Sequence, residues 1–323
     1  MKNAEIVSSF VQSLMNKVPK KTQLTEIMSQ VLNIEKEAAY RRLRGEVQFS
    51  FNEAIILAQK LNISIDEIAL NISFNSQGCI PLQFPLVRDY ERLNYFQLAV
   101  VSDLMDKVTQ GVYSEIGIAL SGVANPFFYE YEEITRFINL KYMYHNKDSL
   151  ECICFEDISE TQEQAKVRQS YNRCFSLFTH SYYIWDMDII PNLIKDIRHF
   201  KSIRLINDEN VKALKSELLE FLDNFELIAS TGCLRHNENK VNVYVSDVGI
   251  EMSAAYLCTK ESYLAVFYAF LFLAYSCSER VVYERVMRWI DSLKRCSTLI
   301  SGTCDKQRVR FFDNQREIVN ALE

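Results

Sequence analysis

The sequence predicts a mainly α-helical protein, α+β overall, with an N-terminal five-helix bundle and a larger, mostly helical C-terminal domain that contains a β-hairpin. Its 323 residues are enough for two domains at roughly 150 residues each. It has only 8 Gly and 5 Pro, too few for a sandwich or barrel that must turn about every ten residues. With 48% hydrophobic and 24% charged residues, it is not collagen-like, purely coiled-coil or wholly disordered.

The first two helices are marked by apolar periodicity and by their ends. Apolar residues at helical spacing over 4–17 predict the first helix, and Pro19 stops it. Thr22 is a suitable N-cap for the second helix, whose apolar stripe runs to Leu32. Asn33 follows, and because Asn tolerates the left-handed conformation, a tight turn is expected there.

Three further helices complete the predicted bundle. The third spans 35–44 and ends at Gly45, a residue well suited to follow a helix. Capping boxes at 50–53 and 64–67 open the fourth and fifth helices. These signals predict five short helices within 78 residues, separated by turns of a few residues.

A linker at 71–85, which contains a Gly and two Pro, separates the predicted domains 1–78 and 79–323. No internal repeat is visible, which argues against a solenoid. Apolar periodicity in the second domain predicts helices at about 89–109, 126–146, 159–178, 188–200, 208–230, 261–275, 279–298 and 305–322.

Strand signals in the second domain are fewer. The segments 241–246 and 251–258 flank a turn at 247–249 and predict a hairpin. The segments 113–121 and 149–155 are further strand candidates.

The run 262–278 carries no formal charge. We expect a buried core helix or a dimer-interface helix here. A membrane anchor is the weaker alternative, because the run includes three Tyr and two flanking Ser and a bilayer core requires about 20 apolar residues.

Charge is unevenly distributed along the chain. The net charge is −6, yet residues 17–44 hold seven basic and three acidic residues. The nine Cys, an odd number, without a signal peptide indicate reduced thiols and a cytoplasmic protein. The local basic charge favours an anionic partner for the N-terminal domain.

The segment 22–45 has the layout of a helix-turn-helix, with a short turn between two helices and a basic exposed side on the second. With its flanking helices it resembles the lambda-repressor-like (Cro/C1, XRE-type) DNA-binding domains. The resemblance covers about residues 4–70 and rests on Leu32-Asn33-Ile34 at the turn, Ser29 in the second helix, Arg44-Gly45-Glu46 at the end of the third, and the segment 57–68.

The sequence departs from the family pattern at three positions. Asn33 replaces the usual Gly of the turn, and Glu35 stands where Ser or Thr normally caps the recognition helix. Leu43 lies one residue later than the buried Leu of the family. The alignment of the recognition helix with the family pattern can therefore shift by one residue.

The resemblance implies that Lys36, Glu37 and Arg41 read bases, with Tyr40 and Arg44 beside them. Arg and Lys can donate to guanine, and a carboxylate can accept from cytosine. Arg42 is expected partly off this side, as a phosphate contact or a solvated charge. The start of the second helix, where amides and the helix dipole favour a phosphate, supplies Lys20, Lys21, Thr22 and Gln23.

Two other classes of function remain open. A basic helix face is commonly only solvated, and the same bundle in a protein-interaction adaptor would dock on protein instead of DNA. The alternative is an enzyme domain fused to a DNA-binding module. We expect no enzyme, metal or cofactor, since the sequence lacks a P-loop and the GxGxxG, GxSxG, HExxH and CxxC motifs.

The second domain offers weaker signals. Cys152 and Cys154 are spaced too closely for a zinc site, and buried thiols are expected. His180 lies near acidic and aromatic residues. We expect a half-buried side chain whose hydrogen bonds are satisfied, with a role in a polar pocket as the alternative. The aromatic clusters 127–131 and 182–185 are expected in the core, with a ligand pocket as the alternative.

Together these features predict a sequence-specific transcription regulator that binds double-stranded DNA as a homodimer. The C-terminal domain is expected to provide dimerisation, sensing of an unknown small-molecule or peptide effector, or both. No membrane partner is expected.

Overall fold

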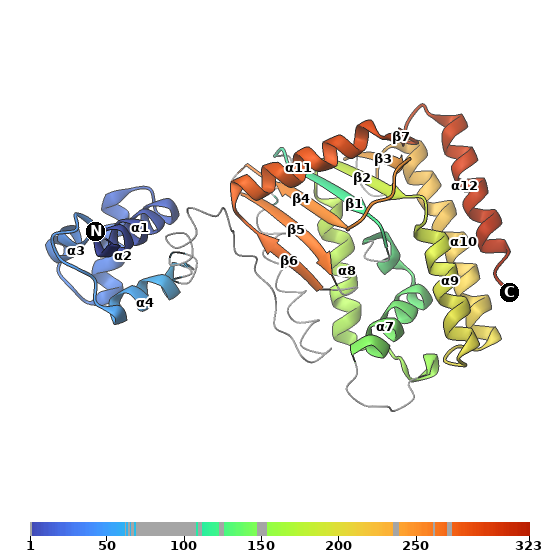
Figure 1. Cartoon of the computed structure of the whole chain (residues 1–323), viewed down its shortest axis with the longest axis horizontal. Helices are drawn as coiled ribbons and strands as arrows, with labels where there is room; N and C mark the ends of the chain where they lie inside the picture. The colour runs from blue at the N-terminus through green and yellow to red at the C-terminus, as the bar shows by residue number, and fades with distance from the viewer. Residues whose placement is uncertain are drawn as a thin grey trace. The chain divides into compact units, whose positions relative to one another are not determined.

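The computed structural model describes residues 2–61, 112–122, 126–146, 154–234, 239–260, 262–269 and 273–323, and residues 63, 65, 68 and 108 individually. The chain divides into two compact units, Met1–Pro81 (unit 1) and Leu82–Glu323 (unit 2) (Figure 1). The boundary expected from sequence lies three residues earlier, after residue 78.

Unit 1 is helical, with α1 (Lys2–Lys17), α2 (Lys21–Leu32), α3 (Lys36–Leu43) and α4 (Phe51–Lys60). These helices confirm the first four predicted ones. The fifth, predicted to begin at 64–67, falls largely outside the described residues. The buried apolar side chains of the four helices and residue 68 form one core: Phe10, Leu14, Leu24, Met28, Ala39, Leu43, Leu57, Ala58 and Ile68.

Local signals in unit 1 act as the sequence predicts at three points. Asn33 adopts the left-handed conformation, with φ 53° and ψ 48°, and ends α2. Gly45 follows α3 with φ 76°, in the region that favours glycine. Ser50 and Glu53 form the reciprocal capping box at the start of α4.

Unit 2 is built on a seven-stranded mixed sheet in the order β6-β5-β4-β1-β2-β3-β7. The strands β1, β2 and β3 are parallel, and every other neighbouring pair is antiparallel. The strands are β1 (Glu115–Leu120), β2 (His180–Asp186), β3 (Lys240–Ser246), β4 (Ala254–Cys258), β5 (Tyr263–Ala269), β6 (Leu273–Cys277) and β7 (Ser297–Leu299).

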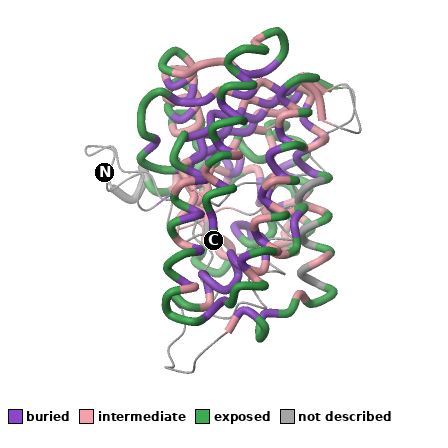
Figure 2. The backbone as a smooth tube through the Cα atoms, turned by 90° about the vertical axis from the view of Figure 1, so that its right-hand side faces the viewer, coloured by how far each residue is buried: buried purple, intermediate pink, exposed green. Residues whose placement is uncertain are grey.

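Helices cover the two faces of the sheet unequally. One face packs on most of the described helices: α7 (Glu132–Asn146), α8 (Gln162–Ser176), α9 (Ile189–Ser202), α10 (Asp208–Thr231) and α12 (Asp305–Asn320), with the 3₁₀ helices η1 (Pro126–Glu130) and η2 (Phe155–Asp157). The other face packs on α11 (Arg280–Arg295), which crosses it (Figure 1). Seen from the side of α12, the helices show buried inner and exposed outer surfaces (Figure 2).

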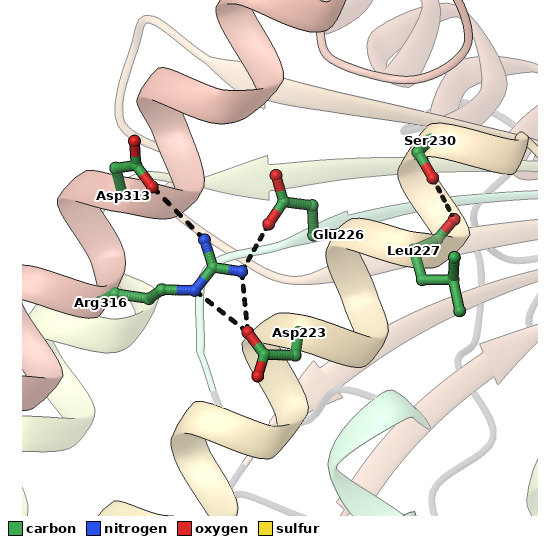
Figure 3. Close-up of polar contacts among 6 residues, drawn as sticks. All are labelled: Asp223, Glu226, Leu227, Ser230, Asp313 and Arg316. Atoms are coloured by element: carbon green, nitrogen blue, oxygen red, sulfur yellow. Dashed lines mark hydrogen bonds and ion pairs between the residues drawn. The ribbon is translucent and has the colours of Figure 1, made fainter.

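The last helix, α12, is held against α10 by a charge cluster (Figure 3). The Arg316 guanidinium donates hydrogen bonds to Asp223, at 2.8 and 3.1 Å, and to Glu226, and lies 3.5 Å from Asp313. At the end of α12, Arg198 donates to the carbonyl oxygen of Ala321 at 2.7 Å. The favourable placement of a cation at a helix C-terminus adds to these bonds.

The helix predicted at 261–275 is wrong. In the structure this region forms β5 and β6, which pair with each other antiparallel. A charge-free apolar run fits a buried helix and a pair of buried strands equally well, so periodicity cannot distinguish them. The described part of the run is therefore not the core or dimer-interface helix that the sequence predicts. In the part of the chain that the structure describes, no helix is both long and apolar enough to span a bilayer.

The hairpin predicted between 241–246 and 251–258 is also wrong, although both segments are strands. β3 pairs with β2 and β7, whereas β4 pairs with β1 and β5. β2 and β7 were not predicted from the sequence. The strand predicted at 113–121 is confirmed as β1.

The remaining predictions for unit 2 have mixed outcomes. The helices predicted at 126–146, 159–178, 188–200, 208–230, 279–298 and 305–322 are confirmed with shifted ends, the first as η1 followed by α7. The helix at 89–109 lies outside the described residues except for residue 108. The strand candidate 149–155 is described only at its end, where η2 begins.

Candidate nucleic-acid interface

The turn between α2 and α3 is held by short-range hydrogen bonds. The backbone amides of Asn33 and Ile34 both donate to the carbonyl oxygen of Ser29. The Ser29 hydroxyl donates to the carbonyl oxygen of Ile34 at 2.6 Å. Because this hydroxyl links the last turn of α2 to the residue after the turn, Ser29 helps to set the angle between α2 and α3.

The two sides of α3 differ sharply. Ala39 and Leu43 are buried in the core of unit 1. The other side exposes Lys36, Glu37, Arg41 and Arg44 and leaves the Tyr40 ring half-buried. The residues that the sequence analysis assigned to base reading therefore share the accessible side of α3. Glu35 precedes the helix in an extended conformation and makes no side-chain cap.

The start of α2 exposes the four residues expected at a phosphate: Lys20, Lys21, Thr22 and Gln23. The predicted cap at Thr22 is wrong, since the N-cap of α2 lies two residues earlier, at Lys20, which makes no side-chain cap. The helix starts at Lys21 because the Lys20 carbonyl already accepts the Leu24 amide, at 3.0 Å. First-turn amides without a side-chain cap remain available to an anion.

The Lys21 ammonium lies 6.0 Å from the centre of the Tyr40 ring, which brings the start of α2 next to the accessible side of α3. The two predicted groups of residues, phosphate-binding and base-reading, are thus neighbours in space. A helix that reads bases in a DNA groove requires such neighbours, because nearby groups must contact the phosphates that flank the groove.

Each basic side chain on the accessible side of α3 lies near a carboxylate. Lys36 pairs with Glu26 at 2.7 Å and Arg41 with Glu46 at 3.5 Å. The exposed Lys36 hydrogen bond and charge lower the pKa of Glu26. The remaining pairs join Arg44 to Glu37 at 3.2 Å and to Glu46 at 3.1 Å.

These ion pairs are exposed on both sides, with 45% or more of each side chain accessible to solvent. Exposed pairs contribute about 0–1 kcal/mol, so a stronger anionic partner can replace the carboxylate. Lys20 and Lys21 make no ion pair among the described residues. The start of α2 is therefore the more available cationic site of the two.

Arg42 is not a solvated charge, which was one of the two roles expected for it. Its guanidinium is half-buried and donates to the Glu53 carboxylate, with a 2.8 Å contact, and to the Ala38 carbonyl oxygen at 3.1 Å. Glu53 also belongs to the capping box of α4. Arg42 thus joins α3 to α4, and the side chain that looked basic in the sequence supports the bundle.

Unit 2 brings few of the other candidates together. Neighbouring residues of β2 alternate between faces, so His180 and Trp185 lie on opposite sides of the sheet. The half-buried His180 has its Nδ1 3.1 Å from the Thr179 hydroxyl. Asp186 accepts the backbone amides of Asp188 and Ile250 at 2.9 and 2.7 Å. These contacts are structural and do not converge on a pocket.

The two aromatic clusters do meet, and they pack as core. The Phe127 and Tyr183 ring centres are 4.7 Å apart, and those of Phe128 and Trp185 are 6.1 Å apart. Within the described residues, no group of three His, Cys, Asp or Glu side chains is arranged to hold a metal ion. Cys152 lies outside the described residues.

Comparison with known proteins finds no match to a family model, to a curated protein or to a solved structure. The residues of the chain itself therefore carry the functional argument.

Proposed function

We propose that the protein is a sequence-specific DNA-binding transcription regulator that uses α2 and α3 as a helix-turn-helix. The observation that carries the proposal is the two-sided character of α3, with Ala39 and Leu43 in the core and the predicted base-reading residues on the accessible side. In this proposal α3 enters the major groove. The lambda-repressor-like resemblance of residues 4–70 supports the same function.

In the proposed complex the residues have separate roles. Arg41 reads a base, with Lys36, Glu37, Tyr40 and Arg44 beside it, and each arginine exchanges its carboxylate partner for DNA. Lys20 and Lys21, at the uncapped start of α2, bind backbone phosphates together with Thr22 and Gln23. A homodimer presents two such helices to two half-sites, about 34–36 Å apart.

Selection of bound sequences from random duplex DNA by the full chain tests the proposal. We expect an enriched motif and an affinity that falls steeply with salt, because lysines and arginines release counterions. An Arg41→Ala variant is expected to relax the preference at one base pair at a cost of about 1–3 kcal/mol. Lys20→Ala is the matched control, since loss of a phosphate contact weakens binding to all sequences alike.

The opposite results are equally informative. A selection without enrichment and a salt slope near zero would remove the proposed function. An unchanged motif with Arg41→Ala would show that the register of α3 on the DNA is wrong.

A second candidate is a protein-interaction adaptor, favoured by the ion pairs that neutralise Lys36, Arg41 and Arg44. A surface of alternating charges suits a protein partner as well as a nucleic acid. Under this alternative the same surface captures a protein and shows no dependence on DNA sequence. Competition with duplex DNA in a binding assay distinguishes the two functions.

A further inference from the structure

The Glu115 carboxylate, at the start of β1, is a half-buried charge without a cation. Its two oxygens accept hydrogen bonds from the hydroxyls of Tyr256, at 2.7 Å, and Tyr113. It makes no ion pair with any Lys, Arg or His of the described residues. Neutral phenols satisfy the oxygens but do not balance the charge, and carboxylates removed from water are normally paired with a cation.

The position of Tyr256 is built into the sheet. Gly117 lies opposite Tyr256 in the β1–β4 pairing, and a Cβ atom there would lie 2.2 Å from the tyrosine ring. Only glycine therefore allows the ring to lie across β1 and bring its hydroxyl to Glu115. Burial first, then the hydrogen bond to Glu115, raises the pKa of Tyr256, which stays a neutral donor.

Two further tyrosine rings extend this group from Tyr256 on the α11 face of the sheet. Tyr283 of α11 packs edge-on against Tyr256, with ring centres 5.9 Å apart, and lies 5.5 Å from Tyr263. Tyr113 and Tyr263 are 56% and 38% exposed, so the rim of the cluster is open to solvent. We call Glu115 and these four tyrosines the Glu115 cluster.

The neighbouring His, Cys and Lys side chains of the described residues do not pair with Glu115. His180 is its neighbour in β2, and the His180 Nδ1 contacts Thr179. Cys258 is its neighbour in β4. Lys294 of α11 lies 3.6 Å from the centre of the Tyr182 ring and pairs with Asp291 at 2.8 Å. A tyrosine of this face of the sheet thus already holds an ammonium group over its ring.

We propose that the Glu115 cluster binds a small organic ammonium ion. Tyrosine faces attract a cation through their negative quadrupole, and the carboxylate provides the opposite charge. An anionic ligand would be repelled by Glu115. The site lies in unit 2 and does not depend on the proposed DNA-binding function. Its ligand would bind whether or not the protein binds DNA.

Calorimetric titration of the full chain, without DNA, tests the site. The probes are choline and ethanolamine, which carry a quaternary and a primary ammonium, and 3,3-dimethylbutan-1-ol, a neutral analogue of choline. We expect at least one of the two cations to bind roughly tenfold or more tightly than the neutral analogue, since the attraction requires the charge. Failure of both cations to bind, or equal binding of the neutral analogue, overturns the proposal.

Variants locate the site. Glu115→Gln keeps one acceptor oxygen, replaces the other with an NH2 donor and removes the charge, so binding of the cation is expected to fall roughly tenfold or more. Tyr263→Leu changes a partly exposed rim ring and is expected to weaken binding several-fold while the unit stays folded. Glu251→Gln, an exposed carboxylate outside the cluster, is the matched control and leaves binding unchanged. Unchanged binding in both cluster variants overturns the assignment.

Discussion

At the scale of single residues, the same residue type has opposite roles within one short helix. Arg41 is exposed, whereas the adjacent Arg42 is half-buried and bonded to Glu53. Charge composition alone cannot separate the two, because the difference lies in which side of α3 faces α4. The separation of functional from supporting residues in unit 1 therefore rests on tertiary contacts.

Loss of the Glu53 carboxylate is expected to destabilise α4. Glu53→Ala removes the return bond of the capping box and leaves Arg42 half-buried without its partner. We expect a loss of about 1–2 kcal/mol in the opening free energy of α4, measured by amide hydrogen exchange. Glu46→Ala, which breaks only exposed pairs, is the control, with a change within about 0.5 kcal/mol. Equal losses in both variants would contradict this role of Glu53.

Acid is expected to weaken unit 1 through the same group. Burial alone would raise the pKa of Glu53, but hydrogen bonds from Arg42 and Ser50 and the Arg42 charge hold it below its ordinary value of 4.5. A carboxylate whose pKa is lowered by folding stabilises the folded state fully at pH values above its unfolded-state pKa. This contribution is lost as the pH falls through its folded-state pKa. The stability of α4 should thus decrease as the pH drops below about 4.5, and the decrease should be smaller in Glu53→Gln. Amide hydrogen exchange at several pH values measures both. Identical pH profiles for the wild type and Glu53→Gln would contradict this role of the Glu53 carboxylate.

Two buried tyrosine hydroxyls are expected to differ in their contribution to stability. The Tyr183 hydroxyl is fully buried and makes no hydrogen bond of good geometry among the described residues, although the Ser181 hydroxyl lies near it, whereas the Tyr256 hydroxyl bonds to Glu115. Tyr183→Phe should leave the free energy of unfolding within about 0.5 kcal/mol of wild type or raise it. Tyr256→Phe should lower it by about 1–3 kcal/mol, because Glu115 loses a donor. Chemical denaturation measures both, and a larger loss in Tyr183→Phe would contradict the assignment.

At the scale of elements, α12 illustrates how a helix is attached to the rest of unit 2. Its apolar side packs into the main core through Phe311, Phe312 and Val319. Its polar side is attached to α10 by Arg316 (Figure 3). Three carboxylates converge on this one guanidinium, so the cation is needed to hold like charges together.

Replacement of Arg316 by Ala is expected to loosen α12. The change leaves Asp223, Glu226 and Asp313 close together without their shared cation, at a cost of about 1.5–3 kcal/mol in the unfolding of unit 2. Thermal unfolding measures the loss. Arg280→Ala on α11 is the control, because Arg280 is 77% exposed in its pair with Glu284 and its loss should leave the unfolding of unit 2 almost unchanged. Similar losses in both variants would show that the cluster on α12 has no special role.

At the scale of the whole molecule, the expected dimer must be held differently from the sequence-based picture. The sequence offers two segments of unit 2 as the seam, the charge-free run 262–278 and the amphipathic segment 279–300, which contains the helix predicted at 279–298. The first is β5 and β6, and the second is α11, whose apolar side packs on the sheet. The outward side of α11 carries Arg280, Glu284 and Arg288 in exposed ion pairs.

We still expect a homodimer held mainly by unit 2, because a single helix-turn-helix reads only a few base pairs. Unit 1 buries the apolar sides of its helices in its own core. Sedimentation of the full chain, of residues 79–323 and of residues 1–78 at micromolar concentration tests this. Monomers for the first two and a dimer for 1–78 would move the interface to unit 1.

Features that depend on near neighbours in the chain could be predicted from the sequence. The turn at Asn33, the end of α3 at Gly45 and the capping box of Ser50 and Glu53 could all be predicted, because a few adjacent residues decide the backbone there. The expected base-reading positions could be placed on one side of α3 for the same reason, since helical periodicity relates them.

Only the tertiary structure decided the contacts between distant segments. The charge-free run at 262–278 became two strands because β4 offers β5 an antiparallel partner, and no local pattern contains that information. The pairing of β1 with β2 and β4 likewise places Glu115 beside Tyr256, which is 141 residues away in the chain. Sheet registers and buried charges are set by long-range pairing, so the Glu115 cluster emerges only from the folded chain.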